Sequence, residues 1–273
     1  MVVSPVGPWP IDRLVTDLSS LGVAEGDVVM VHASLRAIGP VVGGAEGVID
    51  ALDGTVGPPG TILMTLGARN DWDWVNDRPE ADRAALLADA EPFDPLATPA
   101  DPDVGVLAEM FRQQPGTVVS HNPEGRFGAR GRLAGLLLAD APWHDYYGPS
   151  SPLERLVDAG GKVVRLGADL DTVTVLHHAE YLVPLEGKRR VRRHCLVRDG
   201  DGRPEVRVVE CLDDSDGIVD HPGEDYFAQI LRAYLTTGRA RVGRVGHAPS
   251  EVIDAADIVA FGVEWMAEHL GRA

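Results

Sequence analysis

The sequence predicts a single α/β domain in which helices flank a mainly parallel central sheet and an antiparallel hairpin is attached. The first observation is a pair of short apolar runs, Asp27–His32 and Thr61–Leu66, which are typical of buried strands. Between them, Val48, Ile49 and Leu52 repeat at helical spacing. A strand, a helix and a second strand at this spacing form a βαβ unit, whose two strands run parallel.

The second observation is an alternation of polar and apolar residues on both sides of the turn Asp199–Gly202. The segments Arg189–Val197 and Glu205–Leu212 therefore predict a β-hairpin. The third observation is size, because a chain of 273 residues that is 44% hydrophobic can bury a large core. No internal repeat or linker divides it, so we expect one domain over residues 1–273.

Helix caps and apolar spacing predict the remaining elements in order. Pro10 opens a helix whose apolar positions end at Leu21, before Gly22. Asp171 is expected to cap a later helix. The other predictions are a helix after Gly43-Gly44, a helix over Gly105–Arg112, a short strand over Thr117–Ser120, a helix over Ser151–Ala159, a third buried strand over Lys162–Ala168, a helix over Thr172–Leu182 and a last helix over Asp254–Leu270.

Residues 69–104 interrupt this order. From Asp71 to Asp103 there are ten Asp and Glu residues against two Arg. An irregular stretch of this length inside a domain is usually functional or disordered, and its Trp and Phe residues argue against disorder. The acids could receive a polycation, or they could form a solvated loop.

Charge excludes some partners. Lys and Arg number 25 and Asp and Glu 42, which leaves a formal net charge of −17. Such a field repels nucleic acid and anionic membrane and favours a cationic partner, although the same charge could serve only to keep the protein soluble. No secretory signal and no apolar run of about 18 residues is visible, and Cys195 and Cys211 make no disulfide framework, so we expect a cytoplasmic protein.

The clearest candidate for catalysis is the pair His177 and Glu180. Residues three apart share a helix face, and a carboxylate beside an imidazole orients it as a general base. His178 points about 100° away from that face. Two alternatives stay open. One is a helix-surface pair, and the other is a metal site with His121, His144 or His194 as a third ligand, which no metal motif supports.

His32 ends the first buried strand, where parallel sheets bind ligands. His32, Ser34 and the amides near Leu35 and Arg36 are therefore placed to contact a ligand, unless His32 is a core histidine. No hydrolase elbow, phosphate loop or dinucleotide motif occurs, and Gly128–Gly131 is expected to be a loop at most. The basic run from Lys188 to Arg193 could meet phosphates or could be a solvated strand face.

Seven stretches combine in an order and spacing that is specific. They are Val31–Gly44, Glu91–Pro95, Tyr147–Leu156, Gly167–Glu180, Glu186–Val191, Asp214–Ile218 and Ile253–Met266. Over most of its length the chain thereby resembles the aminoglycoside 3-N-acetyltransferase (Antibiotic_NAT) family. One stretch departs: the family commonly has a His-Pro followed shortly by Ser, where this sequence has Asn122 and Arg126.

The resemblance implies the family's own α/β fold, unlike that of GNAT acetyltransferases. It also implies transfer of acetyl from acetyl-coenzyme A to the 3-amino group of a 2-deoxystreptamine aminoglycoside. This reaction needs no metal and confers antibiotic resistance. The expected partners are the cationic drug and acetyl-coenzyme A, and the expected state is a monomer or homodimer. Alternatives are acetylation of another amine, a metal-dependent hydrolase, and a polycation-binding protein without catalysis.

These residues fit direct attack of the amine on the thioester. We expect His177 to act as the base, Glu180 to orient it and His32 to help position a reactant. Ser34, Leu35 and Arg36 are expected to contact the coenzyme, with Lys188 and Arg189 as partners for its phosphates. Residues 69–104 are expected to be a substrate-binding insertion. Acids expected to hold ammonium groups are Asp71, Asp73, Glu91, Asp94, Asp214 and Asp216.

Overall fold

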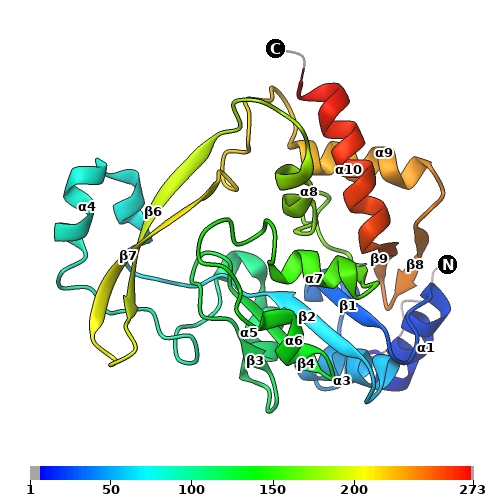
Figure 1. Cartoon of the computed structure of the whole chain (residues 1–273). Helices are drawn as coiled ribbons and strands as arrows, with labels where there is room; N and C mark the ends of the chain where they lie inside the picture. The colour runs from blue at the N-terminus through cyan, green and yellow to red at the C-terminus, as the bar shows by residue number, and fades with distance from the viewer. Residues whose placement is uncertain (1–6, 272–273) are drawn as a thin grey trace.

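A seven-stranded sheet runs through the molecule in the order β3-β4-β2-β1-β5-β9-β8 (Figure 1). The computed structural model describes residues 7–271. The strands are β1 (Val28–Ala33), β2 (Thr61–Thr65), β3 (Val118–Val119), β4 (Phe127–Gly131), β5 (Lys162–Leu166), β8 (Arg241–Val245) and β9 (Ala248–Asp254).

The predicted parallel arrangement is confirmed. The pairs β1–β2 and β1–β5 are parallel. Strands β4 and β9 flank this centre antiparallel, and the edge strands β3 and β8 reverse direction again. Five of the seven strands, namely β3, β2, β1, β5 and β8, therefore run the same way.

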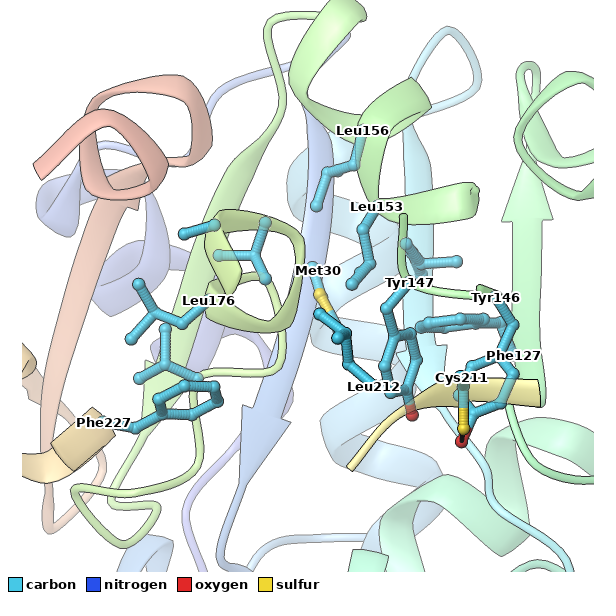
Figure 2. Packing of buried hydrophobic residues seen from close by; sticks show 14 of the residues in the cluster. Met30, Phe127, Tyr146, Tyr147, Leu153, Leu156, Leu176, Cys211, Leu212 and Phe227 are labelled. Atoms are coloured by element: carbon cyan, nitrogen blue, oxygen red, sulfur yellow. Dashed lines mark hydrogen bonds between the residues drawn. The ribbon is translucent and has the colours of Figure 1, made fainter. Parts of the chain in front are cut away.

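Helices cover both faces of the sheet. Side chains alternate along β1, so Val29 and Val31 join one apolar cluster and Met30 joins the other. Figure 2 shows Met30 among Leu153 and Leu156 on one side and Leu176 on the other. The first cluster packs α1 (Ile11–Leu21), α3 (Ala45–Val56) and α5 (Val106–Gln113) against the sheet, and the second packs α6 (Ala134–Leu138), α7 (Pro152–Asp158), α8 (Leu176–Leu182), α9 (Tyr226–Thr236) and α10 (Ala255–His269).

Local sequence signals explain most element ends. Helix α1 ends at Gly22, whose φ of 105° is left-handed and whose amide donates to the carbonyls of Leu18 and Ser19. The hydroxyl of Ser151 caps α7, and the carboxylate of Asp254 caps α10. The hairpin is also confirmed as β6 (Arg190–Arg198) and β7 (Pro204–Leu212), a separate two-stranded sheet that projects from the main one (Figure 1).

Two sequence predictions were wrong. Helix α8 begins at Leu176 rather than Thr172, and Asp171 does not cap it. Before Leu176 the backbone makes turn hydrogen bonds instead, from the amides of Thr172 and Val173 to the carbonyls of Asp169 and Asp171. Gly128–Gly131 is not a loop but most of strand β4, which pairs with β2 at every residue from 127 to 131. The helix α9 and the strands β8 and β9 were not predicted.

The insertion at 69–104 is ordered and contributes to the core. It contains the 3-10 turns η1 (Asp73–Asp77) and η2 (Pro102–Val104) and the helix α4 (Glu80–Leu86), which lies beside the hairpin (Figure 1). Outside the insertion, the four-residue helix α2 (Leu35–Ile38) follows β1. Arg126 is 0% exposed and donates to four carbonyl oxygens, those of Gly67, Pro95, Thr98 and Pro99. Thus the arginine that departs from the family pattern ties the insertion to β4.

Within residues 7–271, every helix is too short or too polar to cross a membrane.

Candidate active site

The predicted pair of His177 and Glu180 lies in a cleft of about 310 Å³ between α8, the loop that follows β7 and the start of α9. We call it the acidic cleft, because its lining includes the carboxylates of Asp171, Glu180, Asp214, Asp216, Glu224 and Asp225. Folding brings these residues together from two separate parts of the chain, residues 171–180 and 214–225. The cleft therefore offers a negative surface around one imidazole.

The imidazole of His177 is held on three sides. Its Nδ1 lies 2.7 Å from Oε2 of Glu180, as the spacing on α8 predicts. The ring of Tyr147 stacks on it with centroids 4.9 Å apart, and the edge of Phe227 meets it at 4.7 Å. Nδ1 is hydrogen-bonded to Glu180, whereas Nε2 has no hydrogen-bond partner within the described chain. That nitrogen is the one left to exchange a proton with a bound molecule.

Charge decides the protonation of His177. Burial alone would lower the pKa of this imidazole, but the charge of Glu180 and its hydrogen bond outweigh burial, so the pKa is raised. The Glu180 side chain is only 2% exposed, so little water screens the interaction. The arrangement favours an imidazolium once His177 has accepted a proton.

His178 lies outside the site, as predicted. It is buried, and its Nδ1 lies 3.0 Å from the carbonyl oxygen of Tyr147. It therefore helps to seat the residue that stacks on His177.

A second pocket, of about 470 Å³, opens at the carboxyl ends of β1 and β2. We call it the β1 pocket. It brings together the predicted residues His32, Ser34, Leu35 and Arg36 with the first turn of α5 and with Thr65 and Thr174. Its lining is more apolar than that of the acidic cleft because Val31, Met64, Val104, Val106 and Leu107 contribute to it.

His32 is in a different electrostatic state from His177. It is 7% exposed, and burial together with the positive charge of Arg165 lowers its pKa to about 3. Its Nε2 is buried and has no hydrogen-bond partner within residues 7–271. Near neutral pH His32 is thus an uncharged group that can offer one hydrogen bond to a molecule in the β1 pocket.

The segment from Asp171 to His177 separates the two pockets. Thr174 lines the β1 pocket, and its hydroxyl lies 3.4 Å from that of Thr65. One turn later, His177 faces the acidic cleft, and its amide donates to the carbonyl of Thr174 at 3.0 Å. The two pockets therefore lie on either side of this turn.

Of the six predicted ammonium-binding acids, only Asp214 and Asp216 line the acidic cleft. Asp214 accepts from the hydroxyl of Tyr146 at 2.8 Å and pairs with Arg193 at 2.6 Å. The other four lie on the insertion and outside the cleft lining: Asp71 is exposed, Asp73 accepts from Asn70 at 3.3 Å, Glu91 pairs with Arg198 at 2.9 Å, and Asp94 accepts from the amides of Leu96 and Ala97.

The pKa of Asp73 is raised to about 6. Desolvation of the Asp73 carboxylate is the largest cause of this rise, and the like charges of Glu124 and Asp101 add to it.

Lys188 and Arg189 lie beside the acidic cleft and do not line the β1 pocket. The ammonium of Lys188 donates to the carbonyl oxygens of Glu180 and Tyr181, at 2.7 and 3.2 Å. Arg189 donates to the carbonyls of Asp216 and Gly217, at 3.0 and 3.2 Å. Both side chains hold the walls of the cleft in place.

The alternative of a metal site requires a third ligand close to His177 and Glu180. Among the described residues, no three His, Cys, Asp or Glu side chains gather in a way that could hold a metal ion. Of the proposed third ligands, His144 instead accepts from the amide of Glu210 at 3.0 Å.

Sequence reasoning missed three aromatic residues around the dyad, Tyr147, Tyr226 and Phe227. Tyr226 donates its hydroxyl hydrogen bond to Oε1 of Glu180. The only local signal was Asp225, a helix-capping residue directly before Tyr226-Phe227. Nothing in a single sequence connects Tyr226 to a carboxylate 46 positions earlier.

Comparison of the sequence with known proteins gives consistent matches. The family model described as aminoglycoside 3-N-acetyltransferase matches residues 30–267. The chain is 43% identical over 272 residues to aminoglycoside N(3)-acetyltransferase VIII of Streptomyces fradiae, covering 98% of this chain and 95% of that one. It is 39% identical over 260 residues to aminoglycoside N(3)-acetyltransferase III of Pseudomonas aeruginosa, covering 95% and 94%.

Solved structures match over nearly the whole chain. One is AAC-IIIb in a binary complex with CoASH, with a TM-score of 0.90, 40% identity and coverage of 98% of this chain and 99% of that one. Another is AAC-VIa bound to sisomicin, with a TM-score of 0.90, 39% identity and coverage of 96% and 99%.

Proposed function

Because the chain belongs to the aminoglycoside 3-N-acetyltransferase family, we propose that it moves acetyl from acetyl-coenzyme A to the 3-amino group of a 2-deoxystreptamine aminoglycoside. The observation that carries the proposal is the arrangement of two pockets on either side of the turn from Thr174 to His177. One pocket suits a polycation and the other a partly apolar acyl donor.

The acceptor is assigned to the acidic cleft. An aminoglycoside carries several ammonium groups, and the cleft lining supplies carboxylates from α8, the loop after β7 and the start of α9. Asp214 and Glu224 already pair with Arg193 and Arg232, whereas Asp171 and Asp216 form no ion pair within residues 7–271. These two are the carboxylates best placed to receive the charges of the drug.

The donor is assigned to the β1 pocket. Arg36 is exposed at this pocket and forms no ion pair in the described part of the chain, so its guanidinium can meet a coenzyme phosphate. The apolar lining suits the pantetheine chain. His32, neutral and unpartnered, can donate or accept one hydrogen bond there, which positions the donor without a proton transfer.

The reaction is then a direct transfer. The free amine nitrogen attacks the thioester carbon and forms the new N–C bond, while the proton leaves that nitrogen for Nε2 of His177. The C–S bond breaks, and the coenzyme leaves as a thiolate that takes up a proton. Glu180 stabilises the imidazolium that forms on His177.

Neither cysteine suits a covalent acyl intermediate. Cys195 and Cys211 are buried in the hairpin, and burial raises the pKa of both thiols, that of Cys211 to about 12. The thiolate is the nucleophilic form, so both side chains stay unreactive near neutral pH. This favours direct attack.

A substrate panel tests the proposal. Purified protein is incubated with acetyl-coenzyme A and individual aminoglycosides, release of free thiol is followed, and the acetylated nitrogen is located by NMR. We expect thiol release only with acceptors that carry a free 3-amino group, and acetyl at that nitrogen. Acetylation at another position, or activity only with unrelated amines, would reject the proposal.

Acetylation would act as resistance because it converts a charged amine into a neutral amide. Expression of the chain in a susceptible bacterium should therefore raise the inhibitory concentration of each aminoglycoside that the purified protein acetylates.

A further inference from the structure

We propose that Tyr226 is a positioning residue, whose hydroxyl holds the Glu180 carboxylate in the orientation that aligns His177, and that it thereby links the acidic loop of the cleft to the catalytic pair. The inference rests on the proposed function and adds a residue that acts through Glu180 rather than on the substrate.

The first observation is that each oxygen of Glu180 has its own partner. Oε2 faces Nδ1 of His177 at 2.7 Å, and Oε1 accepts the hydroxyl of Tyr226. A carboxylate that is 2% exposed has almost no water to replace a missing donor. With both oxygens bound, the carboxylate plane is fixed, and so is the direction in which it holds the imidazole.

The second observation is how firmly Tyr226 is itself placed. It is the first residue of α9, and the Asp225 carboxylate that caps this helix accepts from the amides of Phe227 and Ala228. The ring of Tyr226 meets the edge of Phe227 with centroids 5.2 Å apart. Phe227 in turn contacts the His177 ring, so one helix start supports both members of the pair.

The third observation is that the loop after β7 closes on the same ring. Gly217 has a φ of 79°, and a Cβ at that position would lie 2.9 Å from Cε1 of Tyr226. The amide of the next residue, Ile218, donates to the Tyr226 hydroxyl at 3.4 Å. The hydroxyl thus accepts from the loop and donates to Glu180.

This geometry joins the two tasks of the site. Asp214 and Asp216 lie on the same loop as Ile218, and they line the cleft where the drug is proposed to bind. The position of this loop is transmitted to the Tyr226 hydroxyl and from there to Glu180. Seating of the acceptor and alignment of the base therefore share one hydrogen-bonded link.

Other charged groups also face the pair. Asp214 from the loop after β7 and Asp225 at the start of α9 act on His177 through their charges, and Tyr147 stacks on it from the segment before α7. Lys188 donates to the backbone of Glu180 and not to its carboxylate. Apart from His177, Tyr226 is the only side chain within residues 7–271 that donates to that carboxylate.

The test compares two tyrosines of the same helix. Tyr226→Phe removes the hydroxyl and keeps the ring. Tyr234→Phe is the matched control, because Tyr234 is also buried on α9 and its hydroxyl also donates to a carboxylate, Oδ2 of Asp257 at 2.6 Å, away from the cleft. Melting temperatures of both variants show whether each stays folded.

We expect kcat of Tyr226→Phe to fall about 10-fold, the order of magnitude for loss of one hydrogen bond to a charged group, with KM for the drug unchanged. Without the Tyr226 hydroxyl, no second hydrogen bond offsets the negative charge of Glu180, so this carboxylate stabilises the imidazolium of His177 more strongly. The acidic limb of kcat/KM should therefore move to higher pH. Tyr234→Phe should leave kcat and the limb in place.

A second measurement needs no substrate. NMR titration of the His177 ring, assigned with a His177→Gln variant, should show a higher pKa in Tyr226→Phe than in the unmodified protein. A limb and a ring pKa that stay where they were, or that move to lower pH, would overturn the inference. Failure of the unmodified protein on the drug panel rejects the proposed function instead, and leaves the NMR comparison to decide on Tyr226.

Discussion

His177 and His32 are two largely buried imidazoles whose surroundings drive their pKa values in opposite directions. Burial and Arg165 lower the pKa of His32 to about 3, whereas the Glu180 carboxylate outweighs burial at His177 and raises its pKa. Of the two, only His177 lies in surroundings that stabilise its protonated form. Single-residue changes at these positions have distinct expected effects.

Replacement of the base should abolish most turnover. We expect His177→Ala to lower kcat by about 10²–10⁴-fold, the usual contribution of a general base. The control is His269→Ala, whose ring stacks on Trp265 at the end of α10, outside both pockets. The measurement is thiol release at saturating acetyl-coenzyme A. Unchanged kcat in His177→Ala would remove this residue from the mechanism.

The charge of Glu180 sets the pH dependence. Because the pKa of His177 is raised in the folded protein, kcat/KM should increase as pH rises through that pKa and then level off. Glu180→Gln removes the charge that raises the pKa, so the acidic limb should move to lower pH and the plateau should fall. The readout is a pH profile of both proteins, and identical limbs would contradict the assignment.

At the scale of elements, the insertion at 69–104 depends on one buried cation. Arg126 bonds four carbonyls, three of them in the segment 95–99, and its guanidinium lies over the ring of Phe93 at 5.2 Å. Burial lowers the pKa of Arg126 to about 10, which still leaves it charged at neutral pH. The insertion is therefore part of the folded domain and not an independent loop.

Loss of this arginine should loosen the insertion. Arg126→Met leaves buried carbonyls without donors, and we expect it to lower the free energy of unfolding by on the order of 3 kcal/mol. Urea denaturation measures the loss, and limited proteolysis should show new cleavage between residues 69 and 104. The exposed Arg132→Met serves as the control. Equal stability and equal cleavage in the two variants would refute this role.

At the scale of the whole molecule, the net charge of −17 acts together with the acidic cleft. Long-range attraction of a polycation is screened over about 10 Å at 0.1 M salt. We expect KM for the aminoglycoside to rise with salt while kcat at saturation stays nearly constant. Steady-state kinetics from low to high sodium chloride measure this, and a KM that ignores salt would show that the field does not guide the drug.

Much of the fold was predictable because its signals are local. The βαβ unit, the hairpin and the ends of α1, α7 and α10 follow from apolar spacing, turn residues and caps that act within a few positions. The start of α8 was not predictable, since Asp171 resembles a cap, yet the backbone after it forms turns up to Val175. Strand β4 was missed because glycines carry no strand preference.

For the site, the sequence determined the pair of His177 and Glu180, because three positions on one helix bring two side chains together whatever surrounds them. Only the tertiary structure decided which acids join the pair, that Lys188 and Arg189 support the cleft walls, and that Tyr226 holds Glu180. Those contacts join residues that are far apart in the chain. Their geometry depends on how α8, the loop after β7 and α9 pack, and no local pattern encodes that.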